Sequence, residues 1–254
     1  MLASQRRQKI LELLTEDGVA QVSGLSKIFK ISEVTIRQDL ARLEEEGYVV
    51  REHGGAYLKS LPDQVQSYTF QHMENMDKKS LIGRRAAELI EEGDAVILDS
   101  GSTTTQIAHH IKHLKNLTIV TNAINIPFII GGQPGITVLL TSGEFKAPTL
   151  SLTGQKAADF FENLHVDKLF LATAGITLRA GLTYPSISDL PVKRAMIQAA
   201  STVYLVADST KLGKQSLASL GALSLIHYLI TDEDISQEYL DEFSKHGIEF
   251  IIAS

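Results

Sequence analysis

The chain has 254 residues, of which 44% are hydrophobic and 21% charged. This composition excludes a disordered or collagen-like chain. At about 100–200 residues per domain, the length allows one large domain or two modest ones. It contains no Cys, which excludes disulfides, Cys-ligated zinc, iron–sulfur clusters and thiol catalysis. The net charge is −6, and residues 1–60 hold 9 basic and 9 acidic residues, so the excess acid lies in residues 61–254. Any binding of nucleic acid must therefore come from a small, locally basic face.

Residues 1–58 show the element order of a winged helix-turn-helix domain. Apolar residues at 3–4 spacing predict three helices, and these residues are Ile10, Leu11, Leu13, Leu14, then Leu25, Ile28, Phe29, then Ile36, Leu40, Leu43. Ser23 and Ser32 are candidate N-caps of the second and third helices, and Gly47 is the candidate C-cap of the third. A short segment, Val19–Val22, precedes the second helix, and residues 48–57 predict a strand, a glycine turn and a strand.

The polar face of the third helix carries side chains suited to reading DNA. Arg forks to guanine, Gln pairs with adenine, and a Thr or Val methyl contacts the thymine methyl. An isolated polar helix face is more often simply solvated, but the preceding short helix and the following hairpin favour DNA binding. The residues expected to contact DNA are Arg6, Arg7, Ser32, Val34, Thr35, Arg37, Gln38, Arg42, Arg51, His53, Gly54 and Gly55.

Residues 59–77 have no clean helical or strand period, and Pro62 disfavours helix before it, so they are expected to form a linker. Residues 78–254 then alternate between helix and strand. The expected strands are 95–98, 117–120, 136–140, 168–172, 203–207, 228–231 and 249–252; the expected helices are 78–91, 103–114, 124–130, 190–200 and 237–246. Short apolar strands separated by helices predict a three-layer α/β domain with a parallel sheet covered on both faces.

The loop Asp99-Ser-Gly-Ser-Thr-Thr-Thr105 follows a buried strand and precedes a helix. Backbone N–H groups and the dipole at a helix N-terminus attract an anion. The alternative is an elaborate helix cap, and the pattern alone does not separate the two. The loop lacks the glycine-and-lysine pattern of a nucleotide P-loop, which argues against NTP binding.

A possible metal site is His109-His110-x-x-His113, because His109 and His113 lie one helical turn apart. No carboxylate or further His at matching spacing completes such a site. We therefore expect a solvated helix face, no metal and no cofactor.

Several stretches resemble the DeoR family of bacterial sugar-metabolism repressors. They are Arg6-Arg7-Gln-Lys-Ile-Leu, Ser-x-x-Thr-Ile-Arg-x-Asp-Leu at 32–40, Leu43-Glu44 with Gly47, and His53-Gly-Gly-Ala56. The likeness continues through the whole chain, and residues 99–105 and 21–26 look closest to the N-acetylgalactosamine-pathway repressors. The resemblance implies a C-terminal domain similar to ribose-5-phosphate isomerase and glucosamine-6-phosphate deaminase.

In that family the Ser/Thr loop holds a sugar phosphate, and later Gly, Lys and Asp positions surround the sugar. The resemblance therefore implies effector binding by Asp99, Ser100, Gly101, Ser102, Thr103, Thr104, Thr121, Asn122, Gly143, Gly175, Lys193, Asp208 and Lys211. Ser142 stands where the family usually has Gly, which could narrow the pocket. Thr210 stands where it usually has Ser, and Asp189 where it often has Glu.

The sequence as a whole predicts a DNA-binding regulator, most simply a repressor, of a sugar or amino-sugar operon. Its expected parts are a winged helix at 1–58, a linker at 59–77 and an effector domain at 78–254. Its expected partners are operator DNA, a phosphorylated sugar and further copies of itself, as a dimer or tetramer. One alternative is a sugar-phosphate isomerase or deaminase with an appended DNA-binding module; another is a winged helix that serves only protein assembly. Charges near the N-terminus and the lack of a long apolar run predict a soluble, cytoplasmic protein.

Overall fold

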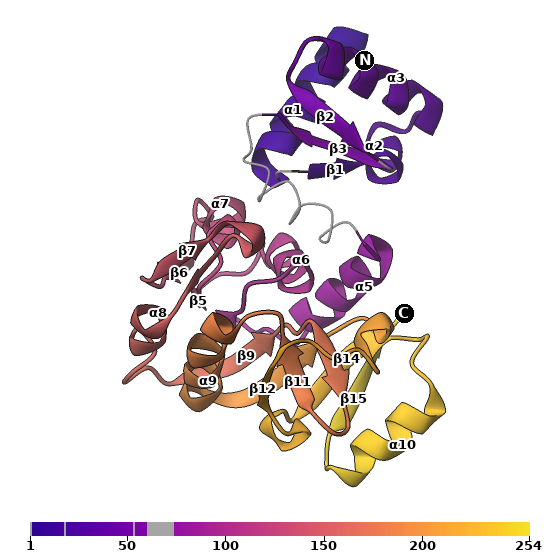
Figure 1. The fold of residues 1–254 in the computed structure, drawn as a ribbon. Helices are drawn as coiled ribbons and strands as arrows, with labels where there is room; N and C mark the ends of the chain where they lie inside the picture. The colour runs from indigo at the N-terminus through magenta and orange to yellow at the C-terminus, as the bar shows by residue number, and fades with distance from the viewer. Residues whose placement is uncertain (1, 18, 53, 60–73) are drawn as a thin grey trace. The chain divides into compact units, whose positions relative to one another are not determined.

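The computed structural model describes residues 2–17, 19–52, 54–59 and 74–254 (Figure 1). The chain divides into two units, Met1–Glu74 and Asn75–Ser254. Most of the expected linker, residues 60–73, lies outside the described residues.

The first unit is a winged helix-turn-helix, as the sequence predicts. Its elements are α1 (Ala3–Asp17), β1 (Val19–Gln21), α2 (Val22–Phe29), α3 (Glu33–Glu45), β2 (Val49–Glu52) and β3 (Gly55–Leu58). The strands form an antiparallel sheet in the order β1-β3-β2. The core joins all three helices to this sheet and consists of Ile10, Leu14, Val22, Leu25, Ile36, Leu40, Leu43, Val49 and Ala56.

Two of the three expected helix caps in this unit are confirmed. The Ser32 hydroxyl accepts a hydrogen bond from the Thr35 N–H at 3.3 Å. Gly47 follows the last helical residues of α3 with a φ of 81°, and its N–H donates to the Glu44 carbonyl at 2.9 Å. The expectation for Ser23 is wrong, because α2 already begins at Val22, whose N–H donates to the Gly54 carbonyl in the wing at 2.8 Å.

The second unit is built on a seven-stranded sheet in the order β15-β14-β12-β9-β4-β5-β6. Every neighbouring pair in it is parallel. Its strands are β4 (Ala95–Leu98), β5 (Leu117–Thr121), β6 (Ile136–Leu140), β9 (Val166–Leu171), β12 (Ala200–Val206), β14 (Tyr228–Asp232) and β15 (Glu249–Ala253). The expected parallel sheet is confirmed.

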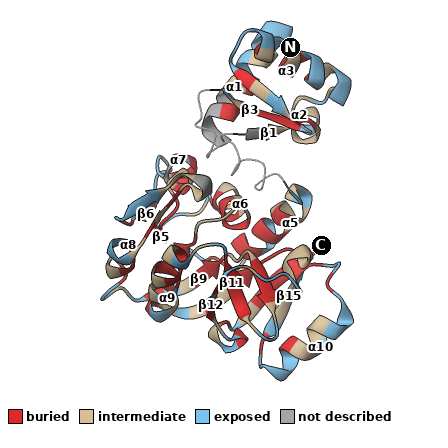
Figure 2. Cartoon of the chain, in the orientation of Figure 1, coloured by how far each residue is buried: buried red, intermediate tan, exposed pale blue. Residues whose placement is uncertain are grey.

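Helices cover both faces of this sheet, so its central strands are buried on both sides (Figure 2). Along β4, Val96 and Leu98 pack in one apolar cluster and Ile97 in the other, as the alternation of a strand requires. The first cluster contains α5 (Met76–Ala87), α6 (Ser102–His110) and α7 (Asn125–Ile130); the second contains α8 (Gln155–Asp159), α9 (Leu190–Ala199) and α10 (Gln237–Lys245).

Short strands and turns outside the main sheet were not predicted. They are β7 (Glu144–Lys146), β8 (Ser151–Thr153), β10 (Gly175–Thr177), β11 (Gly181–Tyr184), β13 (Ala218–Gly221) and the 3₁₀ turns Ala147–Thr149, Ile187–Asp189, Ser209–Lys211 and Leu223–Leu225. These segments have three or four residues, too few to show a period, and they lack a continuous apolar run like that of β4. The helix bounds that differ most from expectation are those of α5 and α6. Helix α5 begins at Met76, within the expected linker, and ends at Ala87 rather than at residue 91, and α6 ends at His110 rather than at Leu114.

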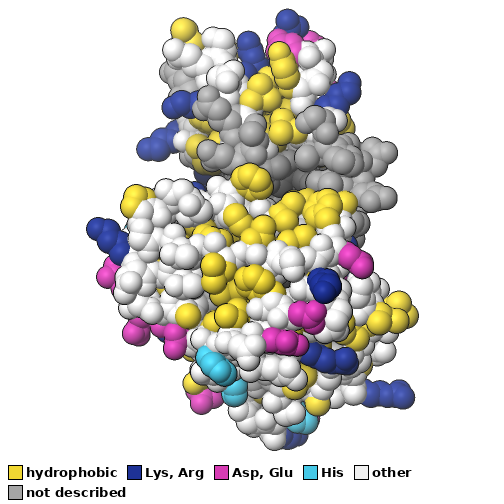
Figure 3. Space-filling model, turned by 90° about the vertical axis from the view of Figure 1, so that its left-hand side faces the viewer, with side chains coloured by type: hydrophobic (Ala, Val, Ile, Leu, Met, Phe, Trp, Pro, Cys, Tyr) yellow, Lys and Arg dark blue, Asp and Glu magenta, His cyan; other side chains and the backbone are white. Residues whose placement is uncertain are grey.

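One side of the second unit carries large apolar side chains at its surface (Figure 3). Phe128 of α7 is 80% exposed and Phe145 of β7 is 54% exposed, while Leu139 and Leu140 of the edge strand β6 are 37% and 40% exposed. Among the described residues, no helix is long and apolar enough to cross a membrane.

Candidate functional site

The outer face of α3 is polar and open to solvent. Val34 is 60% exposed, and Gln38 is exposed beside it. Arg37 is 56% exposed at its side chain and forms a 2.6 Å ion pair with Glu33 one turn earlier. Exposed pairs of this kind contribute little to stability, so the guanidinium can leave Glu33 for a base edge or a phosphate at small cost.

The two arginines farther along this surface are also paired within the unit. Arg42 contacts Glu45 at 3.0 Å and Glu46 at 2.9 Å. Arg51 of β2 donates to Glu44 through both its backbone N–H, at 2.9 Å, and its guanidinium, at 2.8 Å. These hydrogen bonds lower the pKa of Glu44. Glu44 thus fastens the wing to α3, a role that its place in an acidic run did not indicate.

The basic start of α1 is anchored rather than free. Arg6 forms a 2.5 Å ion pair with Asp39 of α3, and their side chains are only 12% and 5% exposed. Arg7 lies 3.7 Å from the other carboxylate oxygen of Asp39. The pair holds α1 against α3, so Arg6 would reach DNA only by giving up a nearly buried partner.

The remaining residues that were expected to contact DNA set the backbone conformation of α3 and the wing. Ser32 caps α3, and its hydroxyl lies 3.0 Å from that of Thr35. Gly54 turns the wing with a φ of 86°, a conformation that favours glycine, and Gly55 begins β3. The expectation for His53 lies outside the described residues.

The candidate ligand site of the second unit lies where the sheet order reverses. Strands β5 and β6 extend from β4 in one direction, and β9, β12, β14 and β15 extend from it in the other. Ligands of open α/β sheets bind outside the carboxyl ends of the strands at such a point. Here Asp99, directly after β4, accepts a 3.0 Å hydrogen bond from the N–H of Ala172, directly after β9.

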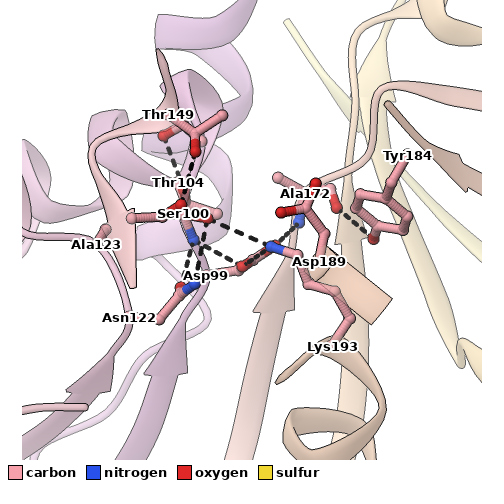
Figure 4. A network of polar contacts seen from close by, with 12 residues as sticks. Asp99, Ser100, Thr104, Asn122, Ala123, Thr149, Ala172, Tyr184, Asp189 and Lys193 are labelled. Atoms are coloured by element: carbon pink, nitrogen blue, oxygen red, sulfur yellow. Dashed lines mark hydrogen bonds and ion pairs between the residues drawn. The ribbon is translucent and has the colours of Figure 1, made fainter. Parts of the chain in front are cut away.

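Asp99 is the centre of a buried polar network (Figure 4). Its side chain is fully buried and accepts a 2.7 Å bond from the Ser100 N–H. It also pairs with the ammonium of Lys193, which comes from α9 and is 4% exposed. Burial raises the pKa of Asp99, while the Lys193 ammonium and the two backbone donors act against this rise. Lys193 is therefore not a free cation for a ligand, because its charge is compensated by Asp99.

Tyr184 of β11 closes one side of this network. The Lys193 ammonium lies 5.5 Å from the centre of the Tyr184 ring, within the range of a cation–π contact. The Tyr184 hydroxyl donates to the Ala172 carbonyl at 2.7 Å. Burial, followed by the nearby Asp99 charge, raises the pKa of Tyr184 well above 10.0, so this phenol acts as a hydrogen-bond donor.

Ser100 and Asn122 tie the end of β4 to the end of β5. The Asn122 carbonyl oxygen accepts from the Ser100 N–H at 3.0 Å, and its amide donates to the Leu152 carbonyl at 3.1 Å. The Ser100 hydroxyl lies 3.3 Å from the Lys193 ammonium. The neutral Ser100 hydroxyl thus stands beside the buried ion pair.

Helix α6 begins shortly after Ser100, and Ser102, Thr103 and Thr104 form its first turn. The first N–H groups of a helix have no partner within it and can bind an anion. Thr104 uses its hydroxyl for the Gly101 carbonyl, at 2.9 Å. A Cβ atom at Gly101 would lie 2.8 Å from the Ala172 side chain, so glycine is needed for the close approach of the two strand ends.

Three other expected residues have structural roles. The Thr121 hydroxyl donates to the Leu98 carbonyl at 2.6 Å and links β5 to β4. Gly143 has a φ of 131°, and a Cβ atom there would lie 2.6 Å from the Thr153 carbonyl oxygen. At Gly175 a Cβ atom would lie 2.4 Å from the Lys214 carbonyl oxygen. These positions shape the loops around Asp99 rather than present side chains to a ligand.

Asp208 lies in a second cluster on the same edge of the sheet. Its Oδ1 accepts from the Thr210 N–H at 3.1 Å and lies 3.5 Å from the amide of Asn75. Within the described residues, no hydrogen bond or ion pair joins it to Asp99 or Lys193. Its other oxygen, Oδ2, is buried without a partner. Lys211 follows in the same turn and is half-buried.

This second cluster also holds the start of α5. The Lys78 ammonium contacts Asp232 at 2.8 Å, Asp234 at 2.6 Å and the Ser209 hydroxyl at 2.8 Å. Burial opposes both charges, but these bonds raise the pKa of Lys78 and lower that of Asp232. Sequence reasoning missed Lys78 and Asp232. Asp232 could have been found, because it stands at the end of an apolar strand, much as Asp99 stands directly after one.

A second ion pair flanks the Asp99 network, and sequence reasoning missed its lysine. Lys146 of β7 donates to both carboxylate oxygens of Asp189, each at 2.8 Å. Asp189 lies just before α9, close to Lys193 in Figure 4. No local pattern marks Lys146, because its partner is 43 residues away in the sequence. Among the described residues, no cluster of His, Cys, Asp and Glu could hold a metal ion.

Comparison with known protein families gives two matches. Residues 6–60 match the DeoR-like helix-turn-helix domain, and residues 74–233 match the DeoR C terminal sensor domain.

The chain is also similar to known proteins along nearly its whole length. The chain is 33% identical to a putative aga operon transcriptional repressor of Escherichia coli O157:H7, over 98% of this chain and 93% of that protein. It is 32% identical to the transcriptional repressor GlcR of Bacillus subtilis, over 99% and 97% of the two chains. Among solved structures, ribose 5-phosphate isomerase from Plasmodium falciparum superposes with a TM-score of 0.39 and 16% identity, over 54% of this chain and 53% of that one. This likeness is too partial to assign a reaction.

Proposed function

Since this chain belongs to the DeoR family of DNA-binding transcription regulators, we propose that it represses a sugar-utilisation operon and that a phosphorylated sugar controls it. Residues 1–58 contact operator DNA, residues 78–254 bind the sugar phosphate, and residues 59–77 join them. The observation that carries the ligand proposal is the bond between Asp99 and Ala172, which places the start of α6 at the reversal point of the sheet.

The phosphate is proposed to bind the N–H groups of Ser102, Thr103 and Thr104 at the start of α6. A helix N-terminus favours an anion by about 0.3–1 kcal/mol through its dipole alone, and hydrogen bonds add to this. Lys193 is engaged by Asp99, so its role is to hold the loop and the Ser100 hydroxyl in place. Lys211 remains the candidate cation for the phosphate, and the unpartnered oxygen of Asp208 the candidate acceptor for a sugar hydroxyl.

The proposed interface with DNA centres on the exposed side chains of α3. Val34, Arg37 and Gln38 read base edges in the major groove, and Arg42 and Arg51 contact phosphates. Each arginine is paired with an exposed or half-exposed glutamate in the absence of DNA. Exchanging such a partner for a DNA phosphate or a guanine edge costs little, since exposed pairs contribute about 0–1 kcal/mol.

The test of the ligand site uses Ser102→Glu, which places a carboxylate at the start of α6 where the phosphate is proposed to bind. Operator fragments are first selected from random DNA with the full chain. Calorimetry with a panel of pentose, hexose and amino-sugar phosphates then identifies the ligand. We expect Ser102→Glu to bind the selected DNA as the parent does and to lose the response to the ligand.

The matched control is Ser201→Glu, at an exposed serine near the amino end of β12, away from the carboxyl ends of the strands where Asp99 lies. It should retain ligand binding and response. If Ser102→Glu binds and responds as the parent does, the phosphate site is not at α6. If the parent selects no DNA, the operator part of the proposal fails independently of the ligand.

The enzymatic alternative rests on the same buried pair, because an Asp and a Lys can exchange protons with a substrate. The named relatives are transcriptional regulators, which favours the regulatory function. An assay for aldose–ketose isomerisation and for amine release, with the ligand found by calorimetry as substrate, separates the two. Turnover by the parent chain that Lys193→Met abolishes, under conditions where the variant remains folded by circular dichroism, would support the enzyme.

A further inference from the structure

The first residues of the second unit contact the turn that carries two of the proposed ligand residues. Asn75 is the first residue of this unit, so the chain enters the unit here. Its side-chain amide donates to the Thr210 hydroxyl at 3.2 Å and lies 3.5 Å from Oδ1 of Asp208. Thr210 belongs to the 3₁₀ turn Ser209–Lys211, and Lys211 is the candidate cation for the phosphate.

Lys78 joins the same two segments a second time. Its ammonium lies 2.8 Å from the Ser209 hydroxyl and 2.8 Å from Oδ1 of Asp232. Asp232 also accepts from Ser209, at 2.7 Å from the N–H and at 2.8 Å from the hydroxyl. Each of these three residues thus contacts the other two. Hydrogen bonds to charged groups are short and strong, so a movement of the turn should be passed to the first turn of α5.

Asp208 is the residue at which a ligand would act on this turn. It is 1% exposed, and its Oδ2 is buried without a partner. A buried acceptor without a donor is costly, so a sugar hydroxyl that donates to Oδ2 is favoured. The two oxygens belong to one rigid carboxylate group, and a donor that turns this group also moves Oδ1. The 3.5 Å contact of Oδ1 with Asn75 is at the long limit of a hydrogen bond, so a small rotation makes or breaks it.

The backbone of Asn75 gives this contact a consequence for the chain. Asn75 has a φ of 55° and a ψ of 36°, in the left-handed region that few residues other than glycine adopt. It stands immediately before α5, and its carbonyl accepts from the Lys79 N–H at 3.0 Å. The side-chain contacts of Asn75 therefore help to fix the direction in which the chain enters α5.

We propose that Asn75 and Lys78 are positioning residues that transmit the binding of a sugar phosphate at Asp208 and Lys211 to the chain that leads to the DNA-binding unit. This regulation rests on the proposed function. A ligand shifts a conformational equilibrium only by as much as its affinities for the two states differ. The contacts described above supply such a difference, because the ligand and the start of α5 bind the same turn.

The test measures the coupling between the two binding events in the full chain. The probes are ribose 5-phosphate, fructose 6-phosphate and glucosamine 6-phosphate, which represent pentose, hexose and amino-sugar phosphates. Operator affinity is titrated with and without each probe, and probe affinity with and without operator DNA. In the parent chain we expect a probe to change operator affinity by about 5–150-fold, and the reciprocal ratio must agree with it.

Two variants remove the contacts at the start of α5. Asn75→Gly removes the amide and keeps the left-handed backbone, which glycine adopts without strain. Lys78→Met removes the ammonium and keeps an unbranched side chain. We expect both variants to bind operator DNA as the parent does in the absence of a probe and to bind the probe in calorimetry. The two coupling ratios should fall together to near unity, a result that loss of stability alone does not produce.

Each variant has a matched control in the same unit. Asn163→Gly makes the same substitution at a φ of 66°, in the loop before β9. Arg85→Met removes an exposed ion pair with Glu88 farther along α5. Both controls should keep the coupling ratios of the parent, because neither residue contacts the turn Ser209–Lys211 through a hydrogen bond or ion pair in the described structure.

Hydrogen exchange gives a second measurement that does not depend on DNA. A saturating probe should change the exchange of amides at the start of α5 in the parent chain, and this change should be absent in Asn75→Gly. If α5 in the parent does not respond to a bound probe, the proposed transmission is wrong.

Two titration results would also overturn this proposal while the proposed function stands. One is a parent that responds to a probe together with folded Asn75→Gly and Lys78→Met variants that respond as strongly. The other is a pair of variants that remain folded by circular dichroism but no longer bind the probe, which would place both residues in the ligand site itself. A parent whose operator binding none of the three probes changes would instead contradict control by a sugar phosphate, and the transmission with it.

Discussion

Replacing Lys193 with Met tests whether the Asp99 pair is as costly to break as its burial implies. Asp99 is fully buried and Lys193 is 4% exposed. The substitution keeps an unbranched side chain of similar length and leaves Asp99 with two of its three donors, the N–H groups of Ser100 and Ala172. Removing one partner of a buried pair costs about 3–5 kcal/mol, because the other charge is left uncompensated. We expect a loss of this size in the second unit.

The control is the same substitution at Lys168, which pairs with Asp94 at 2.6 Å, with side chains 18% and 14% exposed. This pair is closer to solvent, so the charge left on Asp94 is better hydrated and Lys168→Met should cost less than Lys193→Met. Because the two units can unfold separately, stability is measured by hydrogen exchange in peptides that contain β4 and β9. Equal effects of Lys193→Met and Lys168→Met would refute the argument from burial.

The loss of stability caused by Lys193→Met should also depend on pH. Burial already raises the pKa of Asp99 above 3.8, and removing the ammonium raises it further. A carboxyl whose pKa is raised in the folded state binds a proton more readily there than in the unfolded chain. The deficit of the variant should therefore be largest at neutral pH and shrink as the pH falls toward 4. Asp99→Asn combined with Lys193→Met should recover part of the loss at pH 7, and a deficit that is independent of pH would contradict the mechanism.

Three further expectations concern other parts of the chain. Arg37→Ala should weaken binding of selected operator DNA by about 1–3 kcal/mol in a fluorescence titration, whereas Arg85→Ala, which removes an exposed pair on α5, should leave binding unchanged. Gly143→Ala should destabilise the second unit in chemical denaturation, because its φ of 131° and the contact of 2.6 Å to a carbonyl oxygen exclude a Cβ atom. Burial lowers the pKa of His109 to about 4, so the folded state loses stability as the pH falls from 6.5 toward 4, and His109→Gln should flatten that loss in thermal melts recorded across this range.

The main elements of the fold could be predicted because their signals are local. The strand Ala95–Leu98 is four consecutive apolar residues between a Gly-Asp turn and a polar loop, and the structure has it at these bounds. The hairpin of β7 and β8 could not be predicted, since each strand has three residues and their pairing is fixed by contacts across a turn. His109 also departed from the expected solvated face: α6 packs against both α5 and α7, and His109 is buried enough to lower the pKa of its imidazole.

The position of the candidate ligand site in the sheet could be predicted from the sequence, but the pairing of its charged side chains could not. Asp99 was found because a polar residue directly after a buried strand lies at the carboxyl edge of the sheet. Lys193 was expected to bind the effector, and its pairing with Asp99 was not predicted. Pairing of this kind depends on which strand neighbours which, and neither composition nor spacing along the chain contains that information.

The pairing of charges along this edge constrains how an anion can be recognised there. Lys193, Lys146 and Lys78 are each bound to a carboxylate that is nearly buried. A phosphate that drew any of these ammonium groups away from its carboxylate would leave a nearly buried carboxylate uncompensated, which costs several kcal/mol. Backbone N–H groups at α6 and the hydroxyl of Ser100 carry no such cost, so recognition should rest on their hydrogen bonds and on the proposed contact with Lys211. Binding of the sugar phosphate should therefore change less with salt than binding of DNA, which displaces many counterions and should fall steeply as salt increases.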